Sequence, residues 1–291
     1  MKKIFITQFF LILPLVAQSV CPEGEEQRNW NNCIQILEEQ GIKIEVTYLN
    51  GKESDEIKME IPGVGTFEGN FHAFLTSGMG TLYHLNGDVY SGKYVSGVMD
   101  GYGKYTYADG TTYEGASKKN ASHGFGKTKF VNGDMAEGYY RNGLLNGFGE
   151  YKFANGDKYA GFYRNGRRHG KGRFEYANGV IYEGIFKNDE FNGFGKIYYL
   201  TGSIYRGMFK NGNKNGLGFE TLDQGGSYRG YFLNDVWHGR GRYQNNSGDS
   251  YISNFVNGDF GSEFLVIKQR KTRRFTYDGE NIFDELGKIV E

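Results

Sequence analysis

Three of the five histidines, His123, His169 and His238, are the residues whose type best suits metal binding or catalysis. They are separated by multiples of 23 residues, so they occupy the same place in a repeating unit. If each unit contributes two strands, His123 and His169 lie about 19 Å apart. Zinc ligands must lie within about 2 Å of the metal. We therefore predict a loop role for these histidines, and no metal or cofactor.

The carboxylates follow the same interval. Glu114, Glu137 and Glu183 all stand one residue after the start of a unit, which again keeps them apart. Gly-x-Gly recurs in many units but never opens a helix, as a phosphate-binding loop would. Aromatic side chains could stack on sugars, but no acid pair supports a hydrolase of cell-wall polymers. We predict no catalytic residues and no enzyme activity.

The N-terminus resembles an export signal. Lys2 and Lys3 precede an apolar run, Ile4–Ala17, and residues 1–19 are the predicted signal peptide. A retained anchor is the alternative. Cys21 and Cys33 follow, and in an exported chain two such cysteines predict a disulfide. Lipid attachment at Cys21 is the competing interpretation. We expect a periplasmic, envelope-associated or secreted protein.

The dominant feature is the 23-residue repeat itself. Its outline begins nine times without insertion, at Phe67, Tyr90, Tyr113, Ala136, Tyr159, Tyr182, Tyr205, Tyr228 and Tyr251. Counting from zero at these residues, positions 0 and 4 are mostly aromatic, positions 2, 11, 13 and 20 are mostly Gly, and positions 15 and 17 are mostly aromatic or apolar. Alternation at every second residue indicates strands, so each unit is predicted to be two strands.

The glycines also predict the turns. A three-residue loop at positions 18–20, with a left-handed Gly, pairs position 15 with the next position 0 and position 13 with the next position 2. Aromatic rings and Gly pairs then share one face, and the rings cover the bare backbone. Across positions 5–10 we predict that position 4 pairs with position 11. Lys171, Arg173 and Glu175 would face solvent.

This pattern resembles the MORN repeat, with eight full copies over Phe67–Ser250 and a degenerate ninth from Tyr251. The resemblance implies an all-β, elongated, single-layer, twisted antiparallel sheet of hairpins. The expected organisation is a signal at 1–19, a Cys-containing leader and cap at 20–66, the array at 67–250, and a ninth repeat and cap at 251–291. Capping strands are expected at Ile42–Leu49 and Glu56–Ile61, closing strands in EFLVIKQ and RRFTYD, and a short helix in NIFDELGKIV.

Composition and charge limit the partners. Lysine plus arginine equals aspartate plus glutamate at 34 each, so nucleic acid is not an expected partner. We predict a non-catalytic exported scaffold for protein–protein interaction or self-association, including a homodimer. The candidate contact aromatics are Tyr90, Tyr94, Tyr159, Tyr163, Tyr182, Phe186, Tyr205, Phe209, Tyr228 and Phe232.

A basic cluster gives the alternative function. Arg167, Arg168, Lys171 and Arg173 lie within one repeat and could contact anionic lipid or an envelope polymer. In that case the chain is a lipid- or envelope-binding module. A solvated strand edge is the simpler interpretation of the same residues.

Overall fold

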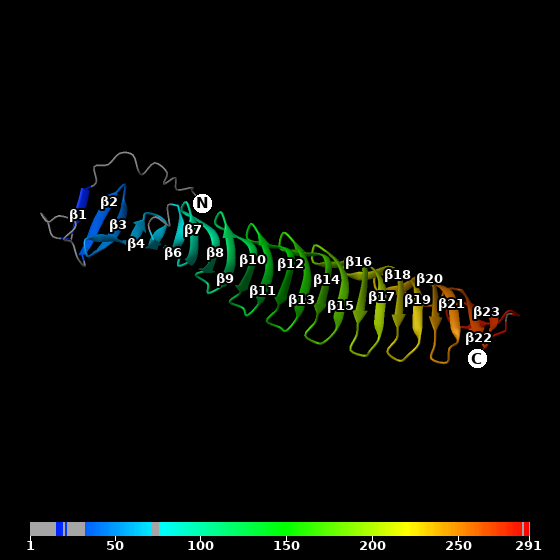
Figure 1. Cartoon of the computed structure of the whole chain (residues 1–291). Coiled ribbons are helices and arrows are strands. Elements are labelled where there is room, and N and C mark those ends of the chain that lie inside the picture. Colours follow the sequence, from blue (N-terminus) through cyan, green and yellow to red (C-terminus); the bar gives the residue numbers. More distant parts are fainter. Residues whose placement is uncertain (1–15, 20, 22–32, 71–75, 287, 291) are drawn as a thin grey trace. The chain divides into compact units, whose positions relative to one another are not determined.

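In a computed structural model, the protein is a series of consecutive β-hairpins (Figure 1). The structure describes residues 16–19, 21, 33–70, 76–286 and 288–290. Every named element in these ranges is a strand, and the neighbours with a given register pair antiparallel. This confirms the all-β fold of hairpins in an open antiparallel sheet. Most of the predicted signal segment, residues 1–15, lies outside the described residues.

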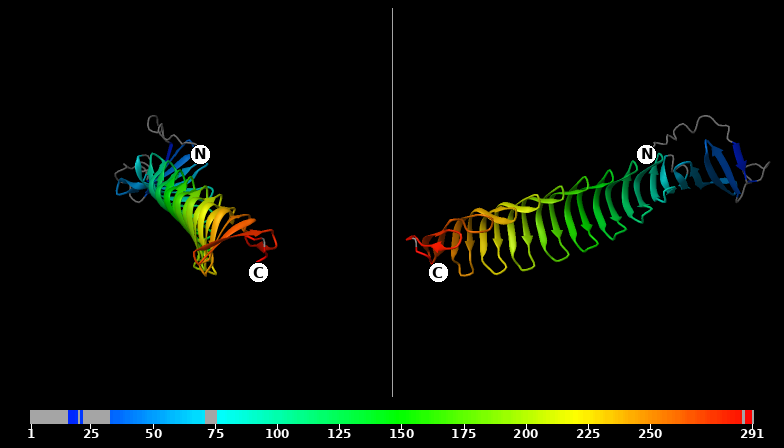
Figure 2. Two further views of the ribbon diagram at one scale, coloured as in Figure 1. Left: turned by 90° about the vertical axis from the view of Figure 1, so that its right-hand side faces the viewer. Right: turned by 180° about the vertical axis from the view of Figure 1, so that it is seen from behind.

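The chain divides into two units, 1–145 and 146–291. In each unit the strands follow one another in chain order (Figures 1 and 2). The first unit contains β1 (Val16–Ser19), β2 (Cys33–Glu39), β3 (Ile42–Leu49), β4 (Lys52–Ile61), β5 (Gly65–Asn70), β6 (Ser77–His84), β7 (Val89–Val95), β8 (Val98–Thr106), β9 (Thr112–Lys118), β10 (Ala121–Lys129) and β11 (Met135–Arg141).

β12 (Leu144–Lys152) leads into the second unit. It is followed by β13 (Lys158–Arg164), β14 (Arg167–Glu175), β15 (Ile181–Lys187), β16 (Glu190–Tyr198), β17 (Ile204–Lys210), β18 (Asn213–Thr221), β19 (Ser227–Leu233), β20 (Val236–Gln244), β21 (Ser250–Phe255), β22 (Glu263–Lys268), β23 (Lys271–Tyr277) and β24 (Ile282–Phe283).

The three-residue loop between successive repeats is confirmed. Phe174 pairs with Tyr182, and Gly172 with Gly184, as the predicted register requires. Around the loop, the Tyr176 N–H donates to the Val180 carbonyl at 2.9 Å. Gly179 closes the loop with φ of 88°, a left-handed value that favours glycine. This register places the aromatic and glycine positions on one face.

The connection inside each repeat is different from the prediction. Phe186 pairs with Phe191, which is position 4 with position 9, so the predicted pairing of 4 with 11 is wrong there. The turn has only two residues, Asn188 and Asp189, with φ of 51° and 75°. Both values are left-handed, as in the hairpin turn whose twist matches that of the strands. The extra residues form a bulge around Gly193, which pairs instead with Phe209 of the next repeat.

The core is a row of rings lying over glycine pairs. The Tyr182 hydroxyl donates to the Ile185 carbonyl at 2.9 Å, and this holds the ring flat against its own hairpin. A Cβ added to Gly184 would lie 2.4 Å from the Tyr182 hydroxyl. Tyr159, Tyr205 and Tyr228 make the equivalent hydrogen bond. The glycines are therefore the space in which the rings lie.

The ends of the array agree with the sequence, with one exception. β3 and β4 lie where the N-terminal caps were expected, and β22 and β23 where the closing strands were expected. The helix predicted over Asn281–Val290 is wrong. The described residues there form β24 and a turn in which the Asp284 carboxylate accepts from the Leu286 and Lys288 N–H groups. Asp284 thus satisfies the turn's own donors, an alternative that aspartate offers to helix.

Candidate functional site

The ten rings predicted to contact a partner lie in the core. Each is at most 8% exposed, and Tyr90, Tyr182, Tyr205 and Tyr228 are fully buried. Neighbouring rings meet edge to face, as for Tyr182 and Phe209 at 5.2 Å. Burial raises the pKa of Tyr228 to about 12. The prediction placed these rings on an accessible surface, but their own packing over the glycines removes them from solvent.

Position 9 supplies the cover that hides these rings. Phe191 stacks on Tyr182 at 3.7 Å between ring centroids, and Trp237 stacks on Tyr228 at 4.2 Å. Arg168 lies 5.7 Å from the Tyr159 ring in the equivalent place. Sequence analysis missed these residues because the wrong internal register assigned them to a loop. The recurrence of an aromatic residue at 191 and 237, two repeats apart, was the available signal.

The cover of Tyr205 is a buried ion pair. Lys214 lies 4.8 Å from the Tyr205 ring centroid and forms a salt bridge with Glu220. The two side chains are only 11% and 14% exposed. Desolvation lowers the pKa of the Lys214 ammonium, but the hydrogen bond and charge of Glu220 outweigh it, and the net pKa is raised. Lys214 therefore stays charged in the core because Glu220 faces it.

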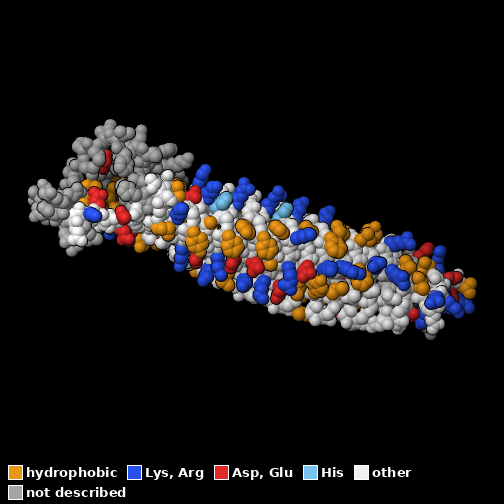
Figure 3. Space-filling view, in the orientation of Figure 1, with side chains coloured by type: hydrophobic (Ala, Val, Ile, Leu, Met, Phe, Trp, Pro, Cys, Tyr) orange, Lys and Arg blue, Asp and Glu red, His pale blue; other side chains and the backbone are white. Residues whose placement is uncertain are grey.

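The opposite face carries an exposed apolar row that the sequence analysis did not identify. Its members come from positions 3 and 12 of the repeats, which pair directly across neighbouring strands. Figure 3 shows hydrophobic side chains gathered over the middle of the strands, with Lys and Arg alongside. In the first unit this exposed row is Met79, Tyr102, Phe125 and Tyr139; in the second it is Phe148, Phe162, Phe194, Met208, Leu217 and Tyr231.

The row is organised by aromatic pairs. Phe125 and Tyr139 meet edge to face at 5.7 Å, and each is 53% exposed. Phe148 and Phe162 do the same at 6.0 Å. Exposed rings of this kind supply large contact area at low entropic cost, and aromatic residues are enriched where proteins bind each other. The row is the candidate interaction surface of the chain.

Charges beside the row are balanced in one part and unbalanced in another. In the first unit Lys127 lies 3.4 Å from Glu137, and in the second Arg173 lies 3.3 Å from Glu183. From β17 to β20, Glu220 is the one acidic residue in the strands, and it lies on the ring face. The row face of those strands carries Arg206, Lys210, Arg229, Arg240 and Arg242.

The predicted basic cluster does not form one patch. The Arg168 side chain lies on the ring face, and its Nη2 donates to the Asp189 carbonyl at 3.0 Å. Arg173 is held by Glu175 and Glu183 on the other face. Arg167 and Lys171 are exposed. Arg168 and Arg173 thus have partners within the chain. The four cations do not form one patch because a strand places alternate side chains on opposite faces.

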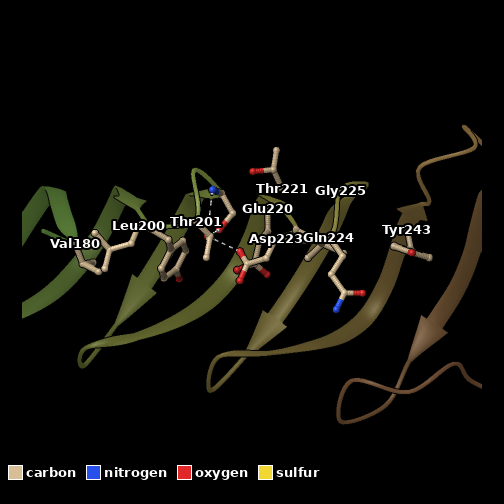
Figure 4. Close-up of a pocket in the computed structure, with 12 residues that line it drawn as sticks. Val180, Leu200, Thr201, Glu220, Thr221, Asp223, Gln224, Gly225 and Tyr243 are labelled. Carbon is tan, nitrogen blue, oxygen red and sulfur yellow. Dashed lines mark hydrogen bonds between the residues drawn. The ribbon is translucent and has the colours of Figure 1, made fainter. Parts of the chain in front are cut away.

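A shallow hollow of about 640 Å³ lies among the loops of β16–β20 on the ring side (Figure 4). Its two carboxylates, Glu220 and Asp223, already have partners. Thr201 donates to Asp223 at 2.6 Å, and hydrogen bonds from Ser203 and Thr201 lower the pKa of the Asp223 carboxyl. The hollow therefore offers packing between loops rather than free acid–base groups.

The described residues contain no group of three or more His, Cys, Asp or Glu side chains able to hold a metal ion. The loop placement predicted for His123, His169 and His238 is wrong: they lie within β10, β14 and β20, at the bulge of their repeats, because the internal turn is shorter than expected. Cys21 and Cys33 form the predicted disulfide. Across the part of the chain that the structure covers, no helix is long and apolar enough to cross a membrane.

Comparison with known proteins gives the class. The MORN repeat family model matches residues 90–112, 113–135, 137–158, 159–181, 182–204, 205–227 and 228–250, more than half of the chain. The protein therefore belongs to the MORN-repeat family. The predicted copy from Phe67 is not among these matches, although β5 and β6 occupy it.

Solved structures and curated proteins add little to this. The TCP domain of Drosophila melanogaster SAS-4, in complex with a proline-rich motif of Ana2, is 12% identical, with a TM-score of 0.34, over 61% of this chain and 90% of that one. The TCP10 domain of Danio rerio CPAP is 12% identical, with a TM-score of 0.26, over 80% of this chain and 97% of that one. The search of curated proteins gave no match.

Proposed function

We propose that this protein is a non-catalytic scaffold that binds another protein through the exposed row. The observation that carries the proposal is the division of the aromatic residues between two faces. On the ring face the rings are buried by packing within the chain, and Tyr182 and Tyr205 are fully buried. The other face keeps rings such as Phe125 and Phe194 more than half exposed.

Within each unit, the exposed apolar side chains of the row favour binding to a partner on physical grounds. Soluble monomers rarely expose a contiguous apolar patch larger than about 300–600 Å². The row contains Tyr102, Phe125 and Tyr139 in the first unit alone, each more than half exposed. Truncating such anchors generally removes most of the energy of an interface. A bound protein would cover them.

The compartment is part of the proposal. The Cys21–Cys33 disulfide is of the kind that persists outside the reducing cytosol. Together with the basic and apolar start of the chain, it supports export to a periplasmic, envelope-associated or extracellular location.

Affinity capture with matched variants tests the function. The full chain, immobilised, is exposed to an extract of its native source, and bound proteins are quantified by mass spectrometry. The test variant carries Phe125→Ser, Tyr139→Ser, Phe148→Ser and Phe162→Ser. The control carries Leu85→Ser and Leu200→Ser, which are exposed in loops away from the row.

We expect at least a tenfold loss of specific partners with the test variant and none with the control. Both variants should remain folded and unfold in a cooperative transition, because each surface change or lost ring pair alters the free energy of unfolding by only about 1 kcal/mol or less. Sedimentation of the purified chain is run alongside. A dimer that dissociates in the test variant identifies a second copy as the partner. Equal retention of every protein by both variants contradicts the proposal.

A further inference from the structure

Between β16 and β20 the exposed apolar row is flanked by several cations. Here Phe194 pairs with Met208, and Leu217 pairs with Tyr231, and all four side chains are exposed. Lys196 pairs with Arg206 beside them, and Arg229 and Arg240 follow on the next strands. We call these eight residues the apolar-basic patch; they are Phe194, Lys196, Met208, Arg206, Leu217, Arg229, Tyr231 and Arg240.

Two of its arginines are held in place. Arg206 lies 4.9 Å from the Phe219 ring centroid, and Arg229 lies 5.9 Å from the same ring on the other side. A guanidinium stacked on a ring keeps its planar set of donors available for a carboxylate. Phe219 stands where other repeats place a charged residue, such as Lys127 or Arg173. The stacking orders the two cations before any partner arrives.

The three arginines of the patch have no acidic residue beside them on their own strands, β17, β19 and β20. Lys196 differs, because it lies on β16 directly across from Glu183. β17–β20 contain Glu220 alone among Asp and Glu, and Glu220 is used by Lys214 on the opposite face. Cations in other repeats have acids beside them, as Lys127 has Glu137, whereas Arg206 and Arg229 flank Phe219 instead. Facing this surface with a second copy of itself would bring like charges together, which costs free energy. Charge complementarity therefore selects an acidic partner.

The surface continues into a hollow of about 340 Å³ at its C-terminal side. Arg240 and Arg274 line it with the apolar side chains of Ile252 and Leu265, and Glu263 is also at its wall. A large apolar side chain from a partner could enter it while carboxylates meet the two arginines. The hollow and the patch together fit a partner that carries both acidic and large apolar side chains.

From these observations we infer that the apolar-basic patch binds an acidic segment of another protein that also carries large apolar side chains. This inference rests on the proposed function and names its partner class. β16 to β20 span about 19 Å at the usual strand separation. About 13 residues of helix cover that distance.

Peptide selection tests the inference. A library displaying random 15-residue peptides is selected against the full chain, and the affinity of enriched peptides is measured by fluorescence anisotropy. One variant carries Arg206→Glu and Arg229→Glu, and a second carries Met208→Ser and Leu217→Ser. The matched control reverses two exposed cations of the first unit, Lys118→Glu and Lys129→Glu.

We expect enriched peptides to combine Asp or Glu with Leu, Phe or Trp. Their Kd should rise at least tenfold in each patch variant, stay within twofold in the control, and rise with added salt. Enriched peptides without acidic excess, whose binding survives the arginine reversals, would overturn the inference and leave the proposed scaffold function intact.

A membrane is the other surface to exclude. Vesicles of phosphatidylcholine alone, and of phosphatidylcholine mixed with the anionic lipid phosphatidylglycerol, are tested with the same variants. Vesicle binding that depends on Arg206 and Arg229, with no acidic peptide enriched, overturns the inference in favour of lipid. If the row variant also retains all captured proteins, the proposed function fails as well.

Discussion

At the scale of single residues, the chain shows how a repeat tolerates a charged pair in its core. Lys214 occupies the place of Phe191 and Trp237, and Glu220 occupies the place of Ile197 and Tyr243. Either charged residue alone would lower the free energy of unfolding, because a buried charge without an opposite charge is costly. Together they form a salt bridge over Tyr205. The pair is predicted to be interchangeable with the apolar residues of the preceding repeat.

Exchange of the pair tests this. Lys214→Ala should lower the free energy of unfolding by about 3 kcal/mol, because it leaves the Glu220 carboxylate buried without a cation, with only the long 3.5 Å hydrogen bond from the Trp237 Nε1–H. The double change Lys214→Phe with Glu220→Ile should restore stability to within about 1 kcal/mol of the wild type or above it. Denaturant unfolding measures both, with the exposed Lys210→Ala as control. A double variant as unstable as Lys214→Ala contradicts the account.

At the scale of the hairpin, the ring and the glycine pair that it covers act as one unit. A Cβ added to Gly172 would lie 2.4–2.7 Å from three atoms of Tyr159, and those are its nearest neighbours. Gly172 has no left-handed φ, so its need for glycine comes from the ring and not from the backbone. The stacking of rings along each unit then depends on every glycine remaining small.

A double-mutant cycle separates the two causes. Gly172→Ala should cost about 2–3 kcal/mol in the wild type, because the methyl group overlaps the ring. In a Tyr159→Leu background the same change should cost less than about 1 kcal/mol. Unfolding free energies of the four chains give the coupling. An equal cost of Gly172→Ala in both backgrounds would show that the ring is not what excludes a side chain there.

At the scale of the whole molecule, the sequence predicted the sheet, the shared ring face and the three-residue loop. Gly179 and Tyr182 stand at positions that hold the same type of residue in nearly every repeat, so the loop and the ring face could be predicted from them. The internal turn was missed because Asn188–Asp189 fits both a two-residue turn and a longer loop, and only the bulge at Gly193 decides between them.

The exposed row was missed for a different reason. Positions 3 and 12 hold rings in some repeats, but Lys93, Lys171 and Arg240 in others. Comparing repeats hides a feature that is present in only part of the array. The apolar-basic patch is likewise specific to β16–β20. What distinguishes this chain from a generic array therefore lies where its repeats differ from one another.

Carbene footprinting of the folded chain measures the division of the aromatic residues most directly. The reagent inserts into accessible side chains, and mass spectrometry reports the modified residue. We predict strong labelling of Phe125, Tyr139, Phe148 and Phe162, and little labelling of Tyr90, Tyr182, Tyr205 and Tyr228 until the chain is unfolded. Strong labelling of the second group in the folded chain, with protection of the first, would contradict the account.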